Sequence, residues 1–262
     1  MTRVEINGEP ATIEALHRAA TWGYGNYTSM QVRGRAVPGL SRHLDRLRTG
    51  SAVLFPGAEP LVGDRVRALV DRALGDLDDA SVRVTVLPRP ADRARTDVMV
   101  SVSEPVSDIP RPPLRVRTVA CERDLAAVKH TGTLAQTFHR LEAQRAGFDD
   151  VLLVARDGSH AEGSVWNIAF WDGDRIVWPE APLLDGIVMQ VLRDGLRVLG
   201  IPDTTRRLTR ESLREMTAAA ATNSHCPAQP IGAIDDVEFR GGEVLTGLLS
   251  RAWKETAWEP LS

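Results

Sequence analysis

The sequence predicts a mixed fold of the α+β or α/β class that is divided into two domains. Short alternating or apolar stretches, typical of strands, are interspersed with amphipathic stretches of helical period. Of the 262 residues, 43% are hydrophobic and 26% are charged, which is enough apolar material for one large or two modest cores. Three prolines fall within residues 107–117, which indicates a linker. We therefore expect a small α+β domain over residues 1–118 and a larger domain over residues 119–262.

The first half alternates between expected strands and helices. Residues 4–12 read as a hairpin that turns at Asn7-Gly8, and residues 27–32 as a strand that turns at Arg33-Gly34. Apolar residues at helical spacing predict two helices, over 41–55 behind a Ser41 N-cap and over 61–74. Two further strands are expected over 82–87 and 98–102.

The second half has the same mixed character. Residues 134–148 read as a helix closed by Gly147, and residues 186–200 as a helix that ends before Gly200. Apolar runs predict buried strands over 151–155 and 165–171. Strands over 218–222 and 231–234 are expected to precede a final helix over 243–258.

Composition and motifs exclude several classes of function. The net charge is −3 and basic residues do not cluster with aromatic ones, so nucleic-acid binding is not expected. Neither a signal peptide nor a membrane-length apolar run is present, which predicts a cytoplasmic protein that does not contact membranes. Cys121 and Cys226 lie far apart and read as reduced thiols. No phosphate loop, dinucleotide fingerprint or HExxH motif occurs, and no metal is expected.

Lysine is rare: among 32 basic residues only Lys129 and Lys254 are lysines. An arginine keeps its proton in a protein, whereas a buried lysine amine can be neutralised and then act as a nucleophile or form a Schiff base. Lys254 lies in RAWKETAW, a segment typical of a solvated helix end. Lys129 is therefore the candidate for covalent chemistry.

Five short motifs occur in a recognisable order: HLDRL with Arg46, AAVKHTGT with Lys129, AEGSVWNI with Glu162, LLDGI with Gly186, and AATNSHCPAQPI with Ser224. Their order and spacing over nearly the whole chain resemble the class IV aminotransferases. This family of fold type IV pyridoxal 5'-phosphate (PLP) enzymes includes branched-chain and D-amino acid aminotransferases, aminodeoxychorismate lyases and (R)-selective amine transaminases. The resemblance implies a D-amino acid aminotransferase-like fold with the cofactor at the interface of two domains.

The resemblance also implies roles for individual residues. Lys129 would form the Schiff base with PLP and carry protons, and Glu162 would keep the pyridine nitrogen protonated. Arg46 would bind the phosphate with its planar guanidinium. The N–H groups of a helix start would bind the same anion. The remaining cofactor residues implied are Gly186, Ile187, Val188, Asn223 and Ser224.

The sequence departs from the family pattern at several positions. Tyr24 and Thr28 stand in GYGNYTS where many members have acids, and Val188 replaces a threonine after the LLxGI motif. The tyrosine that follows the Schiff-base lysine in branched-chain members is Leu134 here.

For substrate binding the resemblance implies Tyr27 and Arg89, although Arg93 or Arg95 would serve equally. The expected function is PLP-dependent transfer of an amino group from a D-amino acid, an (R)-amine or a branched-chain amino acid to a keto acid such as pyruvate. One alternative is an aminodeoxychorismate lyase that releases pyruvate, and another is a PLP-binding homologue without turnover. A homodimer is implied by the resemblance.

Overall fold

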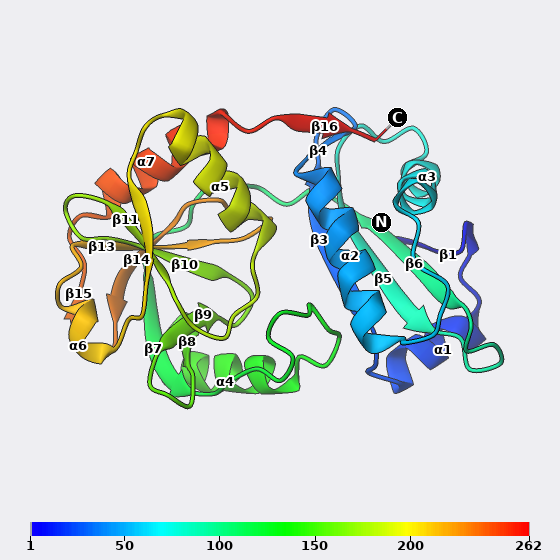
Figure 1. The fold of residues 1–262 in the computed structure, drawn as a ribbon, viewed down its shortest axis with the longest axis horizontal. Helices are drawn as coiled ribbons and strands as arrows, with labels where there is room; N and C mark the ends of the chain where they lie inside the picture. The colour runs from blue at the N-terminus through cyan, green and yellow to red at the C-terminus, as the bar shows by residue number, and fades with distance from the viewer. Residues whose placement is uncertain (1, 262) are drawn as a thin grey trace. The chain divides into compact units, whose positions relative to one another are not determined.

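The computed structural model describes residues 2–261, which form two compact units (Figure 1). Unit 1 comprises residues 2–106, Val128–Gly132 and residues 257–261, and unit 2 comprises Ser107–Ala127 and Thr133–Thr256. The chain thus leaves unit 1 after Val106. A division at residue 118 would cut strand β7, Leu114–Ala120, whose partner strands β8 and β14 belong to unit 2.

Unit 1 contains an antiparallel five-stranded sheet in the order β2-β1-β6-β5-β3. Asn7 and Gly8 both have positive φ, 53° and 88°, as a tight hairpin turn requires, so the predicted hairpin is confirmed. A separate two-stranded pair joins β4 to β16. The strands span β1 Arg3–Ile6, β2 Glu9–Pro10, β3 Asn26–Val32, β4 Ala36–Pro38, β5 Ala80–Pro88, β6 Thr96–Ser103 and β16 Trp258–Pro260.

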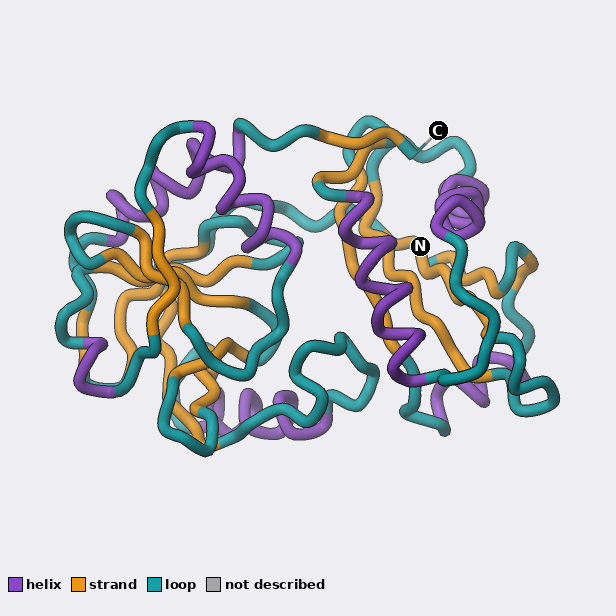
Figure 2. Tube along the Cα trace, viewed as in Figure 1, coloured by secondary structure: helices purple, strands orange, loops and turns teal. Residues whose placement is uncertain are grey.

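The helices of unit 1 are α1 Ile13–Thr21, α2 Leu40–Leu54 and α3 Gly63–Leu74. Figure 2 shows these helices around the strands of the sheet. Alternate residues of β5, such as Val82, Val84 and Val86, join the core with α2 and α3. The residues between them in sequence point to the opposite face, because side chains alternate along a strand. That opposite face therefore carries Arg83 and Thr85.

Two predictions for unit 1 need correction. Helix α2 begins at Leu40 behind Gly39, whose φ is 67°, and not behind a Ser41 cap. Helix α1 was not expected, since no residue of it is buried and its start depends on the Thr12 side chain, which accepts a hydrogen bond from the Ala15 N–H.

Unit 2 contains a nine-stranded sheet in the order β12-β11-β10-β13-β14-β7-β8-β9, with β15 beside β14. The last strand of this order, β9, also contacts β10 and β11, so the sheet curls toward itself. The strands are β7 Leu114–Ala120, β8 Asp150–Val154, β9 His160–Gly163, β10 Asn167–Trp171, β11 Ile176–Pro179, β12 Asp203–Arg206, β13 Ala218–Thr222, β14 Gln229–Ile234 and β15 Val237–Glu238.

The helices of unit 2 are α4 Leu134–Arg145, α5 Ile187–Val198, α6 Arg210–Leu213 and α7 Gly242–Lys254. Helices α5 and α7 pack together on one side of the curled sheet, whereas α4 packs on β7 and β8. Gly147 and Gly200 follow α4 and α5 with φ of 84° and 66°, as predicted for helix ends. Helix α7 ends at Lys254, earlier than expected, and the next residues lead to β16.

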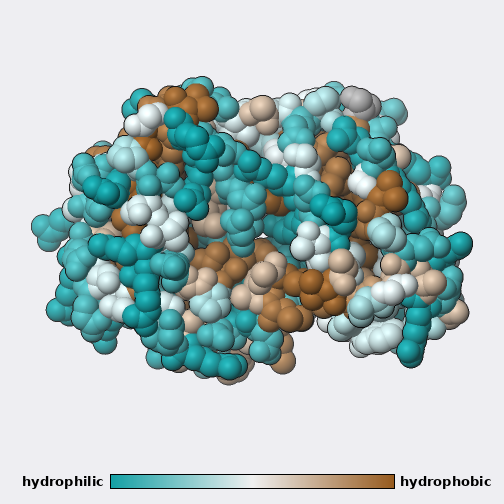
Figure 3. All heavy atoms as spheres, viewed as in Figure 1, coloured by the Kyte–Doolittle hydropathy of each residue, from teal (hydrophilic) through white to brown (hydrophobic). Residues whose placement is uncertain are grey.

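The described residues include no helix of sufficient length and apolar character to span a bilayer. Hydrophilic side chains cover most of the face seen in Figure 3, where apolar side chains occur in smaller groups.

Candidate active site

Lys129 belongs to unit 1 because the segment Val128–Gly132 pairs with β3. The Tyr27 N–H donates to the Lys129 carbonyl oxygen at 2.8 Å, and the Thr131 N–H donates to the Gly25 carbonyl oxygen at 2.8 Å. The Lys129 side chain is partly buried, and its Nζ lies 5.0 Å from the centroid of the Tyr27 ring. The amine is therefore anchored beside a strand and is neither a surface charge nor part of a core.

The Tyr27 ring also carries a second cation. The Arg83 guanidinium carbon lies 3.6 Å from the ring centroid, and Tyr27 itself is only 8% exposed. The Arg83 Nε donates to the Thr85 hydroxyl at 3.4 Å, and no acidic side chain pairs with Arg83 within residues 2–261. Two cations on one aromatic ring make this face of β3 and β5 attractive to an anion.

Arg46 contacts β3 through Thr28, together with His43 of the same helix. The Arg46 Nη2 donates to the Thr28 Oγ1, which lies 2.6 Å from the His43 Nδ1. The Thr28 hydroxyl accepts from arginine, and the tautomer of the imidazole decides which partner donates in its second hydrogen bond. Burial, followed by the charges of Arg46 and Lys129, holds the pKa of His43 well below its usual value. His43 is thus neutral, and its hydrogen bond fixes Thr28 and, through it, Arg46.

In unit 2, Glu162 of β9 lies in a buried polar network. The Arg123 Nη1 and the Leu184 N–H donate to the Glu162 Oε1 at 2.8 Å and 3.1 Å. The Asn167 Nδ2 donates to the Leu184 carbonyl oxygen at 2.8 Å and lies 3.5 Å from the Glu162 Oε2. Glu162 is therefore compensated by a cation and fixed in orientation.

The residues that follow Leu184 form a site suited to an anion. Gly186 precedes α5, and a Cβ at Gly186 would overlap the Asn167 side chain. Ile187 and Val188 open the helix, where N–H groups lack intrahelical acceptors. Thr222 pairs across the sheet with Asn167, and its buried Oγ1 has no hydrogen-bond partner within residues 2–261. A helix start and an unsatisfied hydroxyl fit a phosphate group.

Asn223 and Ser224 lie in the turn after β13. The Asn223 Oδ1 accepts from the N–H groups of His225 and Cys226, so this side chain shapes the turn. Ser224 is partly buried in the same turn. Thr222, which the sequence motif places beside Ser224, is the residue of this strand end whose buried hydroxyl has no hydrogen-bond partner within residues 2–261.

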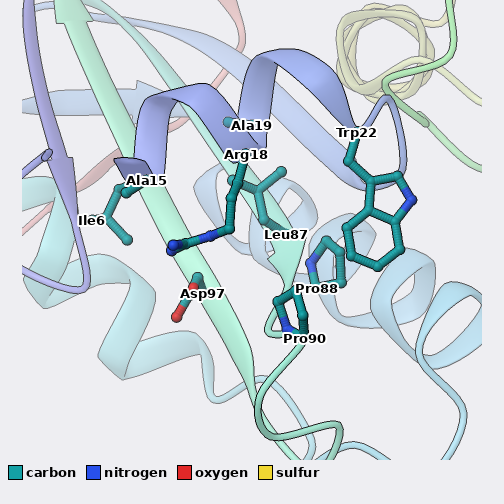
Figure 4. Close-up of a pocket in the computed structure, with 9 residues that line it drawn as sticks. All are labelled: Ile6, Ala15, Arg18, Ala19, Trp22, Leu87, Pro88, Pro90 and Asp97. Atoms are coloured by element: carbon teal, nitrogen blue, oxygen red, sulfur yellow. The ribbon is translucent and has the colours of Figure 1, made fainter. Parts of the chain in front are cut away.

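Arg89 of unit 1 is paired with an acidic side chain. Its Nε and Nη2 donate to the Asp97 Oδ1 at 2.8 Å and 2.6 Å. The same carboxylate lines a small pocket beneath α1, where Figure 4 shows Arg18 reaching toward Asp97 and Trp22 lying near Pro88. None of the cofactor residues expected from the sequence lines this pocket. Arg89 thus lies in an ion pair with Asp97.

The structure groups the expected residues by unit: Lys129, Arg46 and Tyr27 in unit 1, and Glu162, Gly186, Ile187, Val188, Asn223 and Ser224 in unit 2. Sequence reasoning missed Arg83, Arg123 and the positions of His43 and Thr222. His43 lay within the quoted HLDRL motif, but the arginines gave no signal in a chain where almost every basic residue is arginine.

The sequence from residue 25 to residue 234 matches the model of the family described as amino-transferase class IV. The chain belongs to this family. The predicted family and its mixed α/β fold are therefore confirmed. The fold is similar to that of solved aminotransferases over almost the entire chain. The branched-chain aminotransferase from the archaeon Thermoproteus uzoniensis with norvaline has a TM-score of 0.82 at 21% identity, and the match covers 95% of this chain and 93% of that one.

A hypothetical aminotransferase from Mycobacterium tuberculosis in its PLP-bound form has a TM-score of 0.81 at 21% identity, covering 96% of this chain and 98% of that chain. A curated relative, a probable branched-chain-amino-acid aminotransferase of Rickettsia bellii, is 33% identical over 95 residues. This match spans 36% of the present chain and 33% of that relative's length. The cofactor named in the Mycobacterium tuberculosis structure agrees with the one expected for this class IV member.

Proposed function

We propose that this class IV aminotransferase binds PLP and transfers an amino group from an amino acid to a keto acid. The observation that carries the proposal is Lys129, an anchored lysine whose Nζ lies beside the Tyr27 ring in a chain with almost no other lysine. When bound, PLP supplies an electrophilic carbonyl carbon and a ring that withdraws electrons. The side chains and backbone N–H groups of the protein bind and orient the reactants and move the protons.

The proposed roles follow from the chemistry of each group. Arg46, set by Thr28 and His43, would bind phosphate oxygens, as would Thr222 and the N–H groups of Ile187 and Val188. Glu162 would accept a hydrogen bond from the protonated ring nitrogen. The Lys129 Nζ would hold the carbonyl carbon of the cofactor until the incoming amine displaces it. The free amine would then take a proton from the substrate Cα and deliver it to the former carbonyl carbon of the cofactor.

We propose a branched-chain amino acid as the donor and an α-keto acid as the acceptor. The names of the curated relative and of the Thermoproteus uzoniensis structure support this choice. Arg83 would bind a carboxylate of the substrate, because it stacks on the Tyr27 ring that Lys129 also approaches and has no acidic partner within residues 2–261. D-amino acids and (R)-amines are the competing donors, which Tyr27 favours through its likeness to D-amino acid aminotransferases.

A homodimer is also proposed. Helix α4 presents Leu134, Phe138 and Leu141 on one face, and these side chains are 83%, 55% and 47% exposed. Their spacing places them in a single apolar stripe. A second copy of the chain would cover this stripe. Size measured by light scattering tests the dimer, and Leu134→Glu with Phe138→Glu is expected to shift it toward the monomer.

The central experiment examines the cofactor bond at Lys129. The purified protein with added PLP is expected to gain a visible absorption band, and borohydride is expected to fix the cofactor to the peptide that contains Lys129. Lys129→Ala should abolish this attachment and the transamination, whereas Lys254→Ala should change neither. Attachment at Lys254, or no attachment at all, would refute the proposal.

The donor is identified by supplying branched-chain L-amino acids, D-amino acids or (R)-amines with a keto acid and measuring the amino acid formed. Branched-chain L-amino acids are expected to react fastest. Release of pyruvate from aminodeoxychorismate, without transamination of any donor, would instead establish the lyase, which would use the same Lys129.

A further inference from the structure

We propose that Arg123 is a positioning residue that keeps Glu162 ionised and oriented toward the ring nitrogen of PLP. This inference rests on the proposed function. Nothing in the motif pattern marks Arg123, which lies in the loop between β7 and Lys129, six residues before that lysine. It acts through Glu162 and takes no direct part in the reaction.

The contact between the two side chains is short and buried. The Arg123 Nη1 lies 2.8 Å from the Glu162 Oε1, and each side chain is 7% exposed. In the Arg89–Asp97 pair, by contrast, the arginine side chain is 31% exposed. A carboxylate removed from water needs a cation or several donors to remain charged. Arg123 supplies that cation.

The orientation of the carboxylate is set from three segments of the chain. Arg123 and the Leu184 N–H both donate to the Oε1, and Asn167 approaches the Oε2. The Arg123 Nη1 also donates to the Ala126 carbonyl oxygen at 3.0 Å, which holds the guanidinium in its own loop. The direction of the Glu162 carboxylate therefore depends on how this loop is folded.

An ionised carboxylate favours a protonated ring nitrogen, and a neutral one does not. Loss of Arg123 should thus weaken specifically the part of PLP binding that depends on the ring nitrogen. A role limited to folding of the loop would weaken binding of any cofactor analogue of the same shape. The two roles are separable by comparing PLP with its 1-deaza analogue, in which a C–H group replaces the ring nitrogen.

The test measures dissociation constants of PLP and of 1-deaza-PLP for the cofactor-free full chain by calorimetry. For the wild type we expect PLP to bind more tightly than the analogue. In Arg123→Met this preference should fall by about ten-fold or more, the usual size of a hydrogen bond to a charged group. Arg123→Lys, which retains a cation, should keep part of it. Arg193→Met is the control, because Arg193 pairs with Asp203 at 2.9 Å in the same unit and should leave the preference unchanged.

The outcomes distinguish the inference from the function on which it rests. If the wild type binds neither ligand, the proposed function fails and the role of Arg123 fails with it. If the wild type prefers PLP and Arg123→Met keeps or increases that preference while still binding the analogue, only the role of Arg123 is overturned. Should Arg123→Met not fold, Arg123→Gln, which retains hydrogen-bond donors but carries no charge, takes its place, and a preference equal to that of the wild type would overturn the role.

Discussion

Arg83 and Arg89 follow one another on and just after β5, but their guanidinium groups have different surroundings. Arg89 donates twice to Asp97, and the Asn7 Nδ2 donates to the same carboxylate at 2.8 Å. Arg83 lies on the Tyr27 ring, which Lys129 also approaches. We therefore expect Arg89 to stabilise the fold and Arg83 to be available to a ligand.

Substitution of each arginine by methionine separates these roles. Arg83→Met is expected to raise the KM of the amino donor or keto acid by about ten-fold or more, because a charge-assisted hydrogen bond is lost, with a small effect on the melting temperature. Arg89→Met is expected to lower the melting temperature and leave KM nearly unchanged. Steady-state kinetics and thermal unfolding of both variants provide the check, and a raised KM in Arg89→Met alone would reverse the assignment.

Residue types with distinctive chemistry could be identified from the sequence, and abundant types could not. Lys129 was conspicuous because lysine is rare, and Arg46 and Glu162 occupied recognisable motifs. Arg83 and Arg123 acquire their significance from Tyr27 and Glu162, which are distant in sequence. A contact between such residues depends on strand register and loop path, which periodicity does not specify.

Helices α5 and α7 approach closely at a glycine. A Cβ on Gly195 of α5 would overlap the backbone of Ala252 in α7, and both residues are buried. Gly247, in the exposed part of α7, has no atom within 4 Å of the same position. Two glycines in neighbouring helices thus have opposite steric surroundings.

Alanine at these two glycines should have opposite effects on stability. Gly195→Ala is expected to lower the free energy of unfolding by about 1–3 kcal/mol because α7 must move away. Gly247→Ala is expected to raise it by about 0.5–1 kcal/mol through better helix propensity. Urea unfolding of both variants measures the difference, and equal effects would show that α5 and α7 do not pack as described.

Elements with a strong periodic face could be predicted, whereas elements defined by distant partners could not. Helices α3, α4 and α5 occur where apolar spacing placed them, within a few residues. Helix α1 was not predicted, because none of its side chains is buried. Strand β16 consists of three residues, and its partner β4 lies more than two hundred positions earlier in the sequence. No local sequence pattern therefore predicts it.

Each unit contains a buried histidine whose pKa is lowered. Burial is the main cause for His43 in unit 1 and for His160 in unit 2, where the His160 Nδ1 donates to the Leu208 carbonyl oxygen at 3.2 Å. In the unfolded chain these groups titrate at about pH 6.5, and in the folded chain they titrate at a lower pH. Below about pH 6.5 the unfolded chain therefore binds more protons than the folded chain. The two histidines therefore contribute fully to stability above the pKa of the unfolded state, and this contribution decreases as the pH falls below it.

The free energy of unfolding of the whole molecule is therefore expected to decrease between pH 7.5 and 5.5. The slope should reach at most about 1.4 kcal/mol per pH unit for each of the two histidines. Urea titrations at several pH values provide the measurement, with His43→Gln and His160→Gln expected to flatten the slope. His17→Gln, at an exposed position of α1, is the control. A wild-type stability independent of pH would contradict the prediction.

The division into two units was anticipated, but its discontinuity was not. The proline-rich stretch over residues 107–117 predicts a boundary near residue 118, whereas unit 2 begins at Ser107. The sequence does not predict that Val128–Gly132 returns to unit 1, because this segment is held there by a few backbone hydrogen bonds to β3 and Gly25.

The pairing of β16 with β4 links the order of synthesis to the order of folding. Glu259 accepts hydrogen bonds from the Ser41 N–H and hydroxyl, and Leu261 is buried in the core of unit 1. On the ribosome, the sheet of this unit is complete long before residues 257–261 have been translated. In the nascent chain, β4 therefore lacks its partner strand until unit 2 has been translated. During this interval the exposed edge is prone to aggregation, and a chaperone would have its greatest effect.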